Sequence, residues 1–161
     1  ICWCIFKRSM YDLQRALSAL NISSEIINGS IGRDERDVIL SDFKNKKFSV
    51  LITNPHTLAE SVSLHTICHD AVYFEYSYNL VHLLQSKDRI HRLGLPDGQY
   101  TQYYYLMDYF KVNGKDYSLD RMIYNRLMDK ELLMLNAIDH KVLETGASDE
   151  EDLQLILGDL Y

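Results

Sequence analysis

The stretch QSKDRIHRLGL, residues 85–95, decides how this 161-residue sequence is interpreted. Placed on a helix, its polar residues recur at spacings of three and four and therefore share one face: Gln85, Asp88, Arg89 and Arg92. The opposite face is apolar and is expected to pack against a sheet, through Leu80, Leu83 and Ile90. The polar face is therefore presented at an edge of the fold.

The chemistry of this polar face favours an anion. Two guanidinium groups side by side repel each other unless a negative group lies between them, and each planar arginine fork matches the oxygens of a phosphate. Asp88 is spaced to hold one fork in position. The pattern indicates a phosphate site. An ordinary solvated helix face with an Asp–Arg pair has the same spacing, so the wider sequence must decide between the two.

The segments around residues 85–95 alternate between two patterns. Nearly continuous apolar runs predict five buried strands: Cys2–Phe6, Ile22–Ile27, Phe48–Thr53, Ala71–Glu75 and Thr101–Met107. Helical spacing predicts helices after the capping sequence Ser9–Asp12, after Asp34, and from Leu80 to about His91. This alternation is typical of an α/β fold whose parallel sheet is covered on both faces. Because ligands bind such sheets at the carboxyl ends of the strands, the candidate loops follow Phe6, Gly29, Thr53 and Glu75.

The pattern changes near residue 109, which predicts a lobe over residues 1–108 and a helical extension over residues 109–161. The extension begins with a polar loop, Tyr109–Tyr117. Ser118 is expected to cap a long helix that ends near Asp139. An acidic link, Ser148–Asp152, then leads to a short final helix, Leu153–Leu157.

Bulk composition narrows the class of protein. A hydrophobic fraction of 47% allows a real core, and the sequence has neither a signal peptide nor an apolar run long enough to cross a membrane. A net charge of -6 argues against a protein that coats DNA non-specifically. Three cysteines, an odd and sparse set, predict reduced thiols in a cytoplasmic protein. The sequence opens on ICWCIF without Met, so we expect a fragment of a longer protein.

Residues 85–95 resemble the last motif of the Swi/Snf-type ATPases in helicase superfamily two, Q-x-x-D-R-x-H-R-x-G, and match it at every fixed position. The segments 4–17, 26–43 and 50–79 resemble motif IV, the segment that follows it, and motif V with its next strand. Residues 116–135 resemble the helix that braces this lobe in that family. The resemblance covers roughly residues 1–139.

This resemblance implies that the chain is the second of two RecA-like lobes of a DNA-dependent motor. ATP and Mg²⁺ would be bound mainly by the N-terminal RecA-like lobe of the same protein, whose G-x-x-x-x-G-K-[ST] loop is not in this sequence. Arg89 and Arg92 take the arginine-finger positions, which stabilise charge on the transferred phosphoryl group. Gln85, Asp88 and Ser63 take nucleotide-binding and coupling positions. The fragment alone is expected to be inactive.

The same resemblance implies contacts with double-stranded DNA from the loops of motifs IV, IVa and V. The residues that match are Lys7, Arg8, Ser9, Ser30, Arg33 and Thr53. Contacts of this kind go to the DNA backbone and carry no sequence information. For Lys7 and Arg8, ordinary surface charge is the alternative interpretation.

Motif V departs from the remodeller pattern, because residues 53–64 are about two residues longer and contain no glycine. This form resembles the bacterial and phage branch of the family, which implies protein partners in restriction or phage defence. The departure also supports a rival hypothesis, in which a degenerate RecA-like lobe serves as a binding scaffold without ATPase activity. The residues His65 and His69 suggest zinc, but the sequence has no C-x-x-C pair to complete a closed site, so no metal site is expected.

Overall fold

The computed structural model describes residues 1–58, 62–92, 95, 98–112, 114–140 and 148–157. These residues form two compact units. We name them the sheet unit, Ile1–Tyr76 with Val81–Leu106, and the tail unit, Ser77–Leu80 with Met107–Tyr161. Among the described residues, no helix combines the length and the apolar character that crossing a membrane requires.

The sheet unit contains the predicted parallel sheet of five strands. The strands are β1 (Cys2–Trp3), β2 (Ser24–Ile27), β3 (Val50–Thr53), β4 (Asp70–Tyr73) and β5 (Gln102–Tyr105). Their order is β2-β3-β1-β4-β5, and every neighbouring pair is parallel. Strand β1 is central: Cys2 lies opposite both Ile52 and Val72, with the next residue in register on both sides. Parallel pairing of this kind requires crossover connections.

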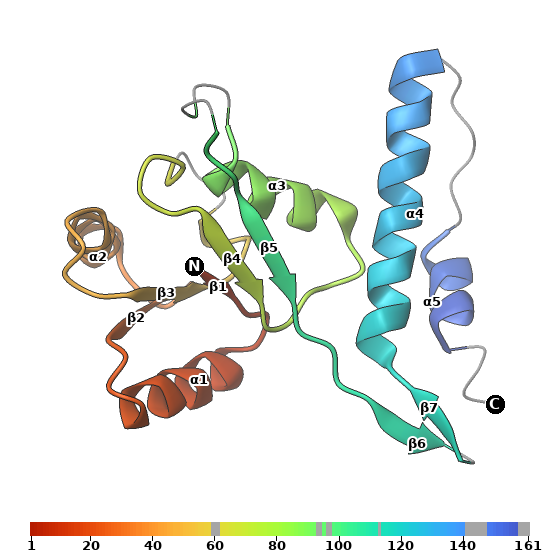
Figure 1. Ribbon diagram of the computed structural model, residues 1–161, viewed down its shortest axis with the longest axis horizontal. Coiled ribbons are helices and arrows are strands. Elements are labelled where there is room, and N and C mark those ends of the chain that lie inside the picture. Colours follow the sequence, from red (N-terminus) through yellow and green to blue (C-terminus); the bar gives the residue numbers. More distant parts are fainter. Residues whose placement is uncertain (59–61, 93–94, 96–97, 113, 141–147, 158–161) are drawn as a thin grey trace. The chain divides into compact units, whose positions relative to one another are not determined.

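Helices α1 (Lys7–Ala19), α2 (Arg33–Lys44) and α3 (Leu80–Ile90) supply three of these crossovers. Figure 1 shows α1 on one face of the sheet and α2 and α3 on the other. This arrangement follows from right-handed crossovers, because α1 leads from the centre to the β2 edge whereas α2 and α3 lead in the opposite direction. Under α1 the core is fully apolar, with Met10 packed on Cys2, Cys4, Ile26 and Ile52.

The elements of the sheet unit are those that the sequence predicts, but the strands are shorter. Strand β1 ends at Trp3, and Phe6, which was predicted to end this strand, is 65% exposed and forms the N-cap of α1 without a side-chain bond. Helix α1 starts at Lys7, so the capping role predicted for Ser9 is wrong. The Ser9 hydroxyl instead donates to the Glu75 carboxylate at 2.5 Å.

The tail unit corrects two sequence predictions. The first concerns Tyr109–Tyr117, which was predicted to be a loop and contains an antiparallel hairpin of β6 (Phe110–Val112) and β7 (Lys115–Tyr117). Gly114 has a φ of +80° between these strands, a conformation that glycine adopts without strain. Helix α4 (Leu119–His140) follows, and the predicted cap is confirmed because the Ser118 hydroxyl accepts the Arg121 N–H at 3.1 Å.

The second correction concerns the acidic run, which is helical. Helix α5 (Asp149–Leu157) includes the residues that were predicted to be a link. Ser148 and Glu151 form a reciprocal capping box, with the Ser148 N–H donating to the Glu151 carboxylate at 2.7 Å and the Glu151 N–H donating back to the Ser148 hydroxyl at 3.3 Å. Acidic residues are stabilising at this position because the N-terminus of a helix carries partial positive charge.

Asp152 attaches α5 to α4 through a buried ion cluster. Its side chain is 0% exposed, and its carboxylate receives Arg126 Nε at 2.6 Å and an ion pair from Lys130. Lys130 also donates to the Tyr78 carbonyl at 3.5 Å. Burial acts to raise the pKa of Asp152, but the hydrogen bonds and charges of Lys130 and Arg126 outweigh burial and hold this pKa below its ordinary value.

We predict that Asp152→Asn loosens α5 from α4, because the substitution leaves two cations of the cluster without their anion. Breaking a buried pair by removing one partner costs about 3–5 kcal/mol. Hydrogen exchange of the α5 amides should accelerate accordingly. Glu150→Gln, which removes one exposed acidic charge from the same helix, is the matched control and should leave the exchange unchanged. Equal exchange in both variants would contradict the role of Asp152.

The lowered pKa of Asp152 also predicts that its contribution to stability depends on pH. Since the folded state lowers the pKa of Asp152, the stabilisation is complete above the unfolded pKa of about 3.9. It is lost as the pH falls through the lower folded-state value. The difference in α5 protection between the wild type and Asp152→Asn should therefore be constant near neutral pH and shrink below about pH 4.

Candidate functional site

The topology separates the predicted site residues into two groups. Helix α3 runs from the carboxyl end of β4 to the amino end of β5, so its last turn lies toward the amino edge of the sheet. The residues at this end form the arginine cluster: Ser63, Gln85, Asp88, Arg89 and Arg92. The loops after β1 and β2 lie at the opposite edge and hold the carboxyl-edge cluster: Lys7, Arg8, Ser9, Ser30 and Arg33. Thr53, the last residue of β3, also lies at the carboxyl edge, but it is buried.

Helix α3 is fixed on the sheet by a buried hydroxyl pair. The Tyr73 hydroxyl of β4 and the Ser86 hydroxyl of α3 are 2.7 Å apart, and the Ser86 hydroxyl also donates to the Leu83 carbonyl at 2.7 Å. Because both hydroxyls are buried, they specify the rotation of α3 about its axis. This rotation directs the next turn, which carries Arg89, toward residues 62–64 at the end of motif V.

Arg89 ties this segment to α3. Its Nε donates to the Gln85 carbonyl at 3.2 Å, and its Nη1 donates to the Val62 carbonyl at 3.4 Å. In return, the Leu64 N–H donates to the Arg89 carbonyl at 2.8 Å. Arg89 is therefore half-buried and preoriented, and Ser63 lies between the two residues that contact it. The Ser63 hydroxyl is bonded to His65 Nδ1.

The other members of the arginine cluster differ in exposure. Gln85 is half-buried, and Arg92 is exposed two residues beyond the end of α3. Asp88 is exposed and lines a hollow of about 420 Å³ with His91 and Tyr103. Gly94, the last fixed position of the motif, lies outside the described residues.

The carboxyl-edge cluster is built on the beginnings of α1 and α2. Lys7 Nζ donates to the Ser30 hydroxyl, which joins the first residue of α1 to the turn after β2. Arg8 has a side chain 94% exposed, 3.7 Å from Asp12, and a surface pair of this kind contributes little to stability. Arg33 is exposed at the first residue of α2. Three cations therefore face solvent along one edge of the sheet unit.

Asn28 shapes the turn that presents Ser30, and sequence reasoning missed it. Its side chain is 1% exposed, its Oδ1 accepts the Ser30 N–H at 2.8 Å, and its Nδ2 donates to the Tyr11 hydroxyl at 3.5 Å. The available signal was the Asn28-Gly29 pair after a strand, because Asn side chains hydrogen-bond the backbone two residues further on.

Glu75 is the second residue that sequence reasoning missed. Its Oε2 accepts the backbone N–H groups of Ile5 and Phe6, both at 2.9 Å, and its Oε1 accepts the Ser9 hydroxyl at 2.5 Å. Ser9, predicted to contact DNA, therefore donates its hydroxyl within the protein. An acidic residue directly after a buried strand was the available signal.

Thr53 differs from the other residues predicted to contact DNA. Its side chain is 0% exposed, and its hydroxyl donates to the Asn54 carbonyl at 3.4 Å. A bond from this hydroxyl to a phosphate would require the end of β3 to open. The residues after it form a turn, in which Asn54 Oδ1 accepts the Thr57 N–H at 2.8 Å.

Two further contacts hold this turn. The rings of His56 and His82 meet edge-on with centroids 3.9 Å apart, which joins the turn to α3. Burial first, and then the proximity of His56, lower the pKa of His82, so its imidazole is neutral near neutral pH. The second contact comes from α2, where Arg36 donates to the Thr57 carbonyl at 3.4 Å.

The cysteines have no features of a ligand set. Cys2 and Cys4 are buried in the core, and a hydrogen bond with Cys2, followed by burial, raises the pKa of the Cys4 thiol. Metal ligation requires a thiolate, which the environment of Cys4 disfavours. His65, half of the pair that suggested zinc, is bonded to Ser63.

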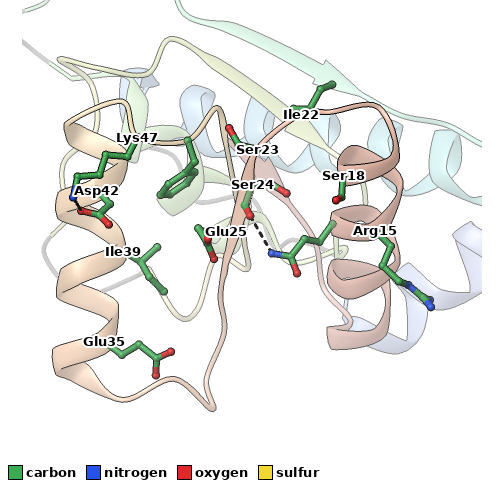
Figure 2. Close-up of a pocket in the computed structure, with 12 residues that line it drawn as sticks. Arg15, Ser18, Ile22, Ser23, Ser24, Glu25, Glu35, Ile39, Asp42 and Lys47 are labelled. Carbon is green, nitrogen blue, oxygen red and sulfur yellow. Dashed lines mark hydrogen bonds and ion pairs between the residues drawn. The ribbon is translucent and has the colours of Figure 1, made fainter.

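A polar groove of about 710 Å³ follows the free edge of β2 between α1 and α2, as Figure 2 shows. Its walls are internally paired: Gln14 Nε2 donates to the Ser24 carbonyl at 3.0 Å, and Lys47 lies 2.7 Å from Asp42. None of the predicted site residues lines this groove.

Comparisons with known proteins identify the family of the chain and agree with its fold. The model of the helicase conserved C-terminal domain family matches residues 1–94. Among solved structures, the chain is similar to the C-terminal part of the Fun30 ATPase domain, with a TM-score of 0.68 and 16% identity over 99% of this chain and 46% of that one. None of the curated proteins matches the chain.

Two more solved structures share the fold. A variant of S. cerevisiae Dbp5, bound to RNA and ADP BeF3, has a TM-score of 0.62 and 17% identity over 80% of this chain and 31% of its own. A DEAD box protein from the hyperthermophile Methanococcus jannaschii has a TM-score of 0.58 and 18% identity over 83% of this chain and 32% of its own. The chain spans less than half of each of the three proteins. These likenesses confirm the predicted α/β, RecA-like fold of a helicase C-terminal lobe.

We predict that Asn28→Ala destabilises the turn that carries Ser30. The substitution removes the acceptor of the Ser30 N–H, and loss of one such hydrogen bond costs about 0.5–1.5 kcal/mol. Thermal unfolding and hydrogen exchange of the Ser30 amide should both report this loss. Asn45→Ala, which removes an exposed side-chain bond to the Ser41 carbonyl, is the matched control. A larger effect at Asn45 would contradict the prediction.

Proposed function

This chain belongs to the helicase conserved C-terminal domain family, and from that premise we propose that it is the second motor lobe of an ATP-dependent DNA translocase of the Swi/Snf type. In this proposal, ATP is bound by a first RecA-like lobe, and the present lobe supplies arginine fingers and contacts the backbone of duplex DNA. By itself the lobe would not hydrolyse ATP.

The arrangement of Arg89 and Arg92 is the observation that carries the proposal. Arg89 is held by two backbone carbonyls, so its position costs little further ordering when a phosphate approaches. Arg92 lies in the open just past α3, where it can reach a nucleotide on another lobe. A degenerate scaffold has no requirement for two arginines presented in this way, which favours the motor over the rival hypothesis.

The donors in the arginine cluster fit a phosphate better than a metal. Each guanidinium offers five N–H donors and repels a cation, whereas Mg²⁺ is held by carboxylates together with substrate phosphates. We therefore assign Mg²⁺ mainly to the first lobe, and to this chain the contacts with phosphoryl oxygens. Gln85, half-buried on the same side of α3, is a neutral group suited to sensing the nucleotide.

The carboxyl-edge cluster supports the nucleic-acid half of the proposal. Lys7, Arg8 and Arg33 present positive charge from two helix beginnings, and Ser30 adds a hydroxyl beside Lys7. Such groups bind the phosphate backbone irrespective of base sequence. The arginine cluster lies toward the amino ends of the strands and the carboxyl-edge cluster at their carboxyl ends, so one lobe can contact both the nucleotide and the nucleic acid.

Arginine substitution in the full-length protein tests the motor. We expect DNA-stimulated ATP hydrolysis to fall by about 10³–10⁵ in Arg89→Ala and in Arg92→Ala, the range that loss of an arginine finger causes in other NTPases. Arg15→Ala removes an exposed arginine that pairs with Asp12 on α1, and it should leave turnover unchanged.

Each result of this assay has a definite meaning. Wild-type turnover by Arg92→Ala would exclude the finger role of Arg92. Absence of turnover in a folded wild-type protein would favour the scaffold. Lysine variants at positions 89 and 92 retain the charge but lose the planar fork, so they should recover little of the activity if the fork is what matters.

The nucleic-acid contacts predict a salt dependence. Replacing Lys7 or Arg33 by Gln should weaken binding of the full-length protein about equally for duplexes of different sequence. Each substitution should also reduce the slope of log K against log salt by roughly one. Fluorescence anisotropy over a series of salt concentrations measures both quantities. An effect confined to one DNA sequence would contradict a backbone contact.

A further inference from the structure

Glu75 links the end of β4 to the beginning of α1. Its carboxylate receives three donors, the N–H groups of Ile5 and Phe6 and the hydroxyl of Ser9. The backbone supports the same junction, because the Glu75 N–H donates to the Trp3 carbonyl at 3.2 Å. We propose that Glu75 is a positioning residue that fixes Lys7 for contact with the nucleic-acid backbone and couples this contact to α3. This inference rests on the proposed nucleic-acid role of the carboxyl-edge cluster.

The position of the carboxylate is favourable for a helix beginning. The first N–H groups of a helix and of the residues before it have no partner within the helix, and they concentrate partial positive charge. Phe6, the N-cap residue, makes no side-chain capping bond, so this task falls to Glu75. An anion from the segment after β4 therefore stabilises the turn that the local sequence leaves uncapped.

This bond sets the place of Lys7, the residue directly after Phe6. Lys7 reaches across to Ser30, so the turn held by Glu75 also determines the distance between the first residue of α1 and the turn after β2. If the turn relaxes, Lys7 and Ser30 no longer have to remain together. Loss of Glu75 would therefore weaken nucleic-acid binding even though Glu75 itself does not contact the nucleic acid.

Glu75 also lies on the route to the arginine cluster. It follows β4 by two residues, and the chain then continues into α3, which begins at Leu80. Tyr73 of β4 is bonded to Ser86 of α3, so movement at the end of β4 is transmitted to the helix that carries Arg89. One carboxylate thus joins the strand end to the helix that presents Lys7.

Electrostatics and positioning predict opposite effects of removing this charge. A carboxylate near phosphates repels them, so if charge alone mattered, Glu75→Gln would strengthen nucleic-acid binding. If Glu75 positions Lys7, the same variant weakens binding, because the amide replaces one acceptor oxygen by a donor. The sign of the change therefore distinguishes the two explanations.

The experiment measures binding of a fluorescein-labelled DNA duplex to the full-length protein. We expect Glu75→Gln to weaken binding about tenfold, equivalent to ~1.4 kcal/mol. Ser9→Ala, which removes one donor to Glu75 without changing charge, should weaken binding in the same direction. Glu35→Gln removes one exposed carboxylate from the beginning of α2 and should leave binding unchanged or slightly tighter.

Coupling is tested by ATP turnover of the same variants. Glu75→Gln should raise the DNA concentration needed for half-maximal stimulation and lower the maximal stimulation. Unchanged or tighter DNA binding by Glu75→Gln would overturn the inference. Maximal stimulation equal to that of the wild type would overturn the proposed coupling between Glu75 and α3.

Failure of the proposed function remains distinguishable from failure of this inference. If the wild type binds no duplex, the nucleic-acid role is wrong and the functional part of the inference falls with it. Hydrogen exchange of the Ile5 and Phe6 amides decides the structural part independently. Exchange equally slow in the wild type and in Glu75→Gln would show that the carboxylate does not hold the turn.

Discussion

The pairing of β1 with both of its neighbours is the constraint on which the sheet unit depends. Strand β1 is only two residues long, yet it is the shared partner of β3 and β4. Trp3, at its end, is completely buried and stacks on Tyr73 at 6.4 Å between ring centroids. Because β1, β3 and β4 are parallel and in register, their carboxyl ends reach the same edge, and the residues that follow them become neighbours.

This register explains why residues far apart in the sequence act together. Glu75 reaches the backbone of Ile5 across 70 positions of sequence because β4 and β1 end side by side. At the other edge of the sheet, the C-terminal turn of α3 meets the segment at Val62 and Leu64. A single rigid sheet therefore carries a nucleic-acid candidate surface at one edge and a phosphate candidate at the other. Coupling between them requires only that one crossover element shift relative to the strands.

Features that depend on local sequence pattern were predicted, whereas features that depend on contacts with distant residues were missed. Period and composition identified all five strands of the sheet and the helices α1 to α4, because burial imposes these patterns directly. Strand ends were less accurate, since pairing partners decide where a strand stops: Phe6 is as apolar as a core residue but has no strand beside it. The Ser9 cap was wrong for a related reason, because the carboxylate of Glu75, two residues after β4, already satisfies the N–H groups at that helix end.

The same limit applies to the site. Helical spacing predicted one face carrying Gln85, Asp88, Arg89 and Arg92, but α3 ends at Ile90, before Arg92. No spacing could show that Arg89 is held by the Val62 carbonyl. Long-range bonds of this kind depend on the crossover geometry. Glu75 belongs to this category too, since its bond to the Ile5 N–H spans 70 positions. The Asn28 bond to the Ser30 N–H spans only two positions and could have been read from the Asn28-Gly29 pair.

The acidic run at Asp149–Asp152 shows how misleading charge alone can be. Counted as exposed charge, it predicted a solvated link, yet Asp152 is completely buried between Arg126 and Lys130. Replacing such a cluster by apolar residues of the same volume is often neutral for stability, so its value lies in specificity. Arg126 and Lys130 are one helical turn apart and meet a single carboxylate, which fixes both the rotation and the height of α5 along α4. An apolar helix face would permit α5 to slide by a turn; the ion cluster defines one register.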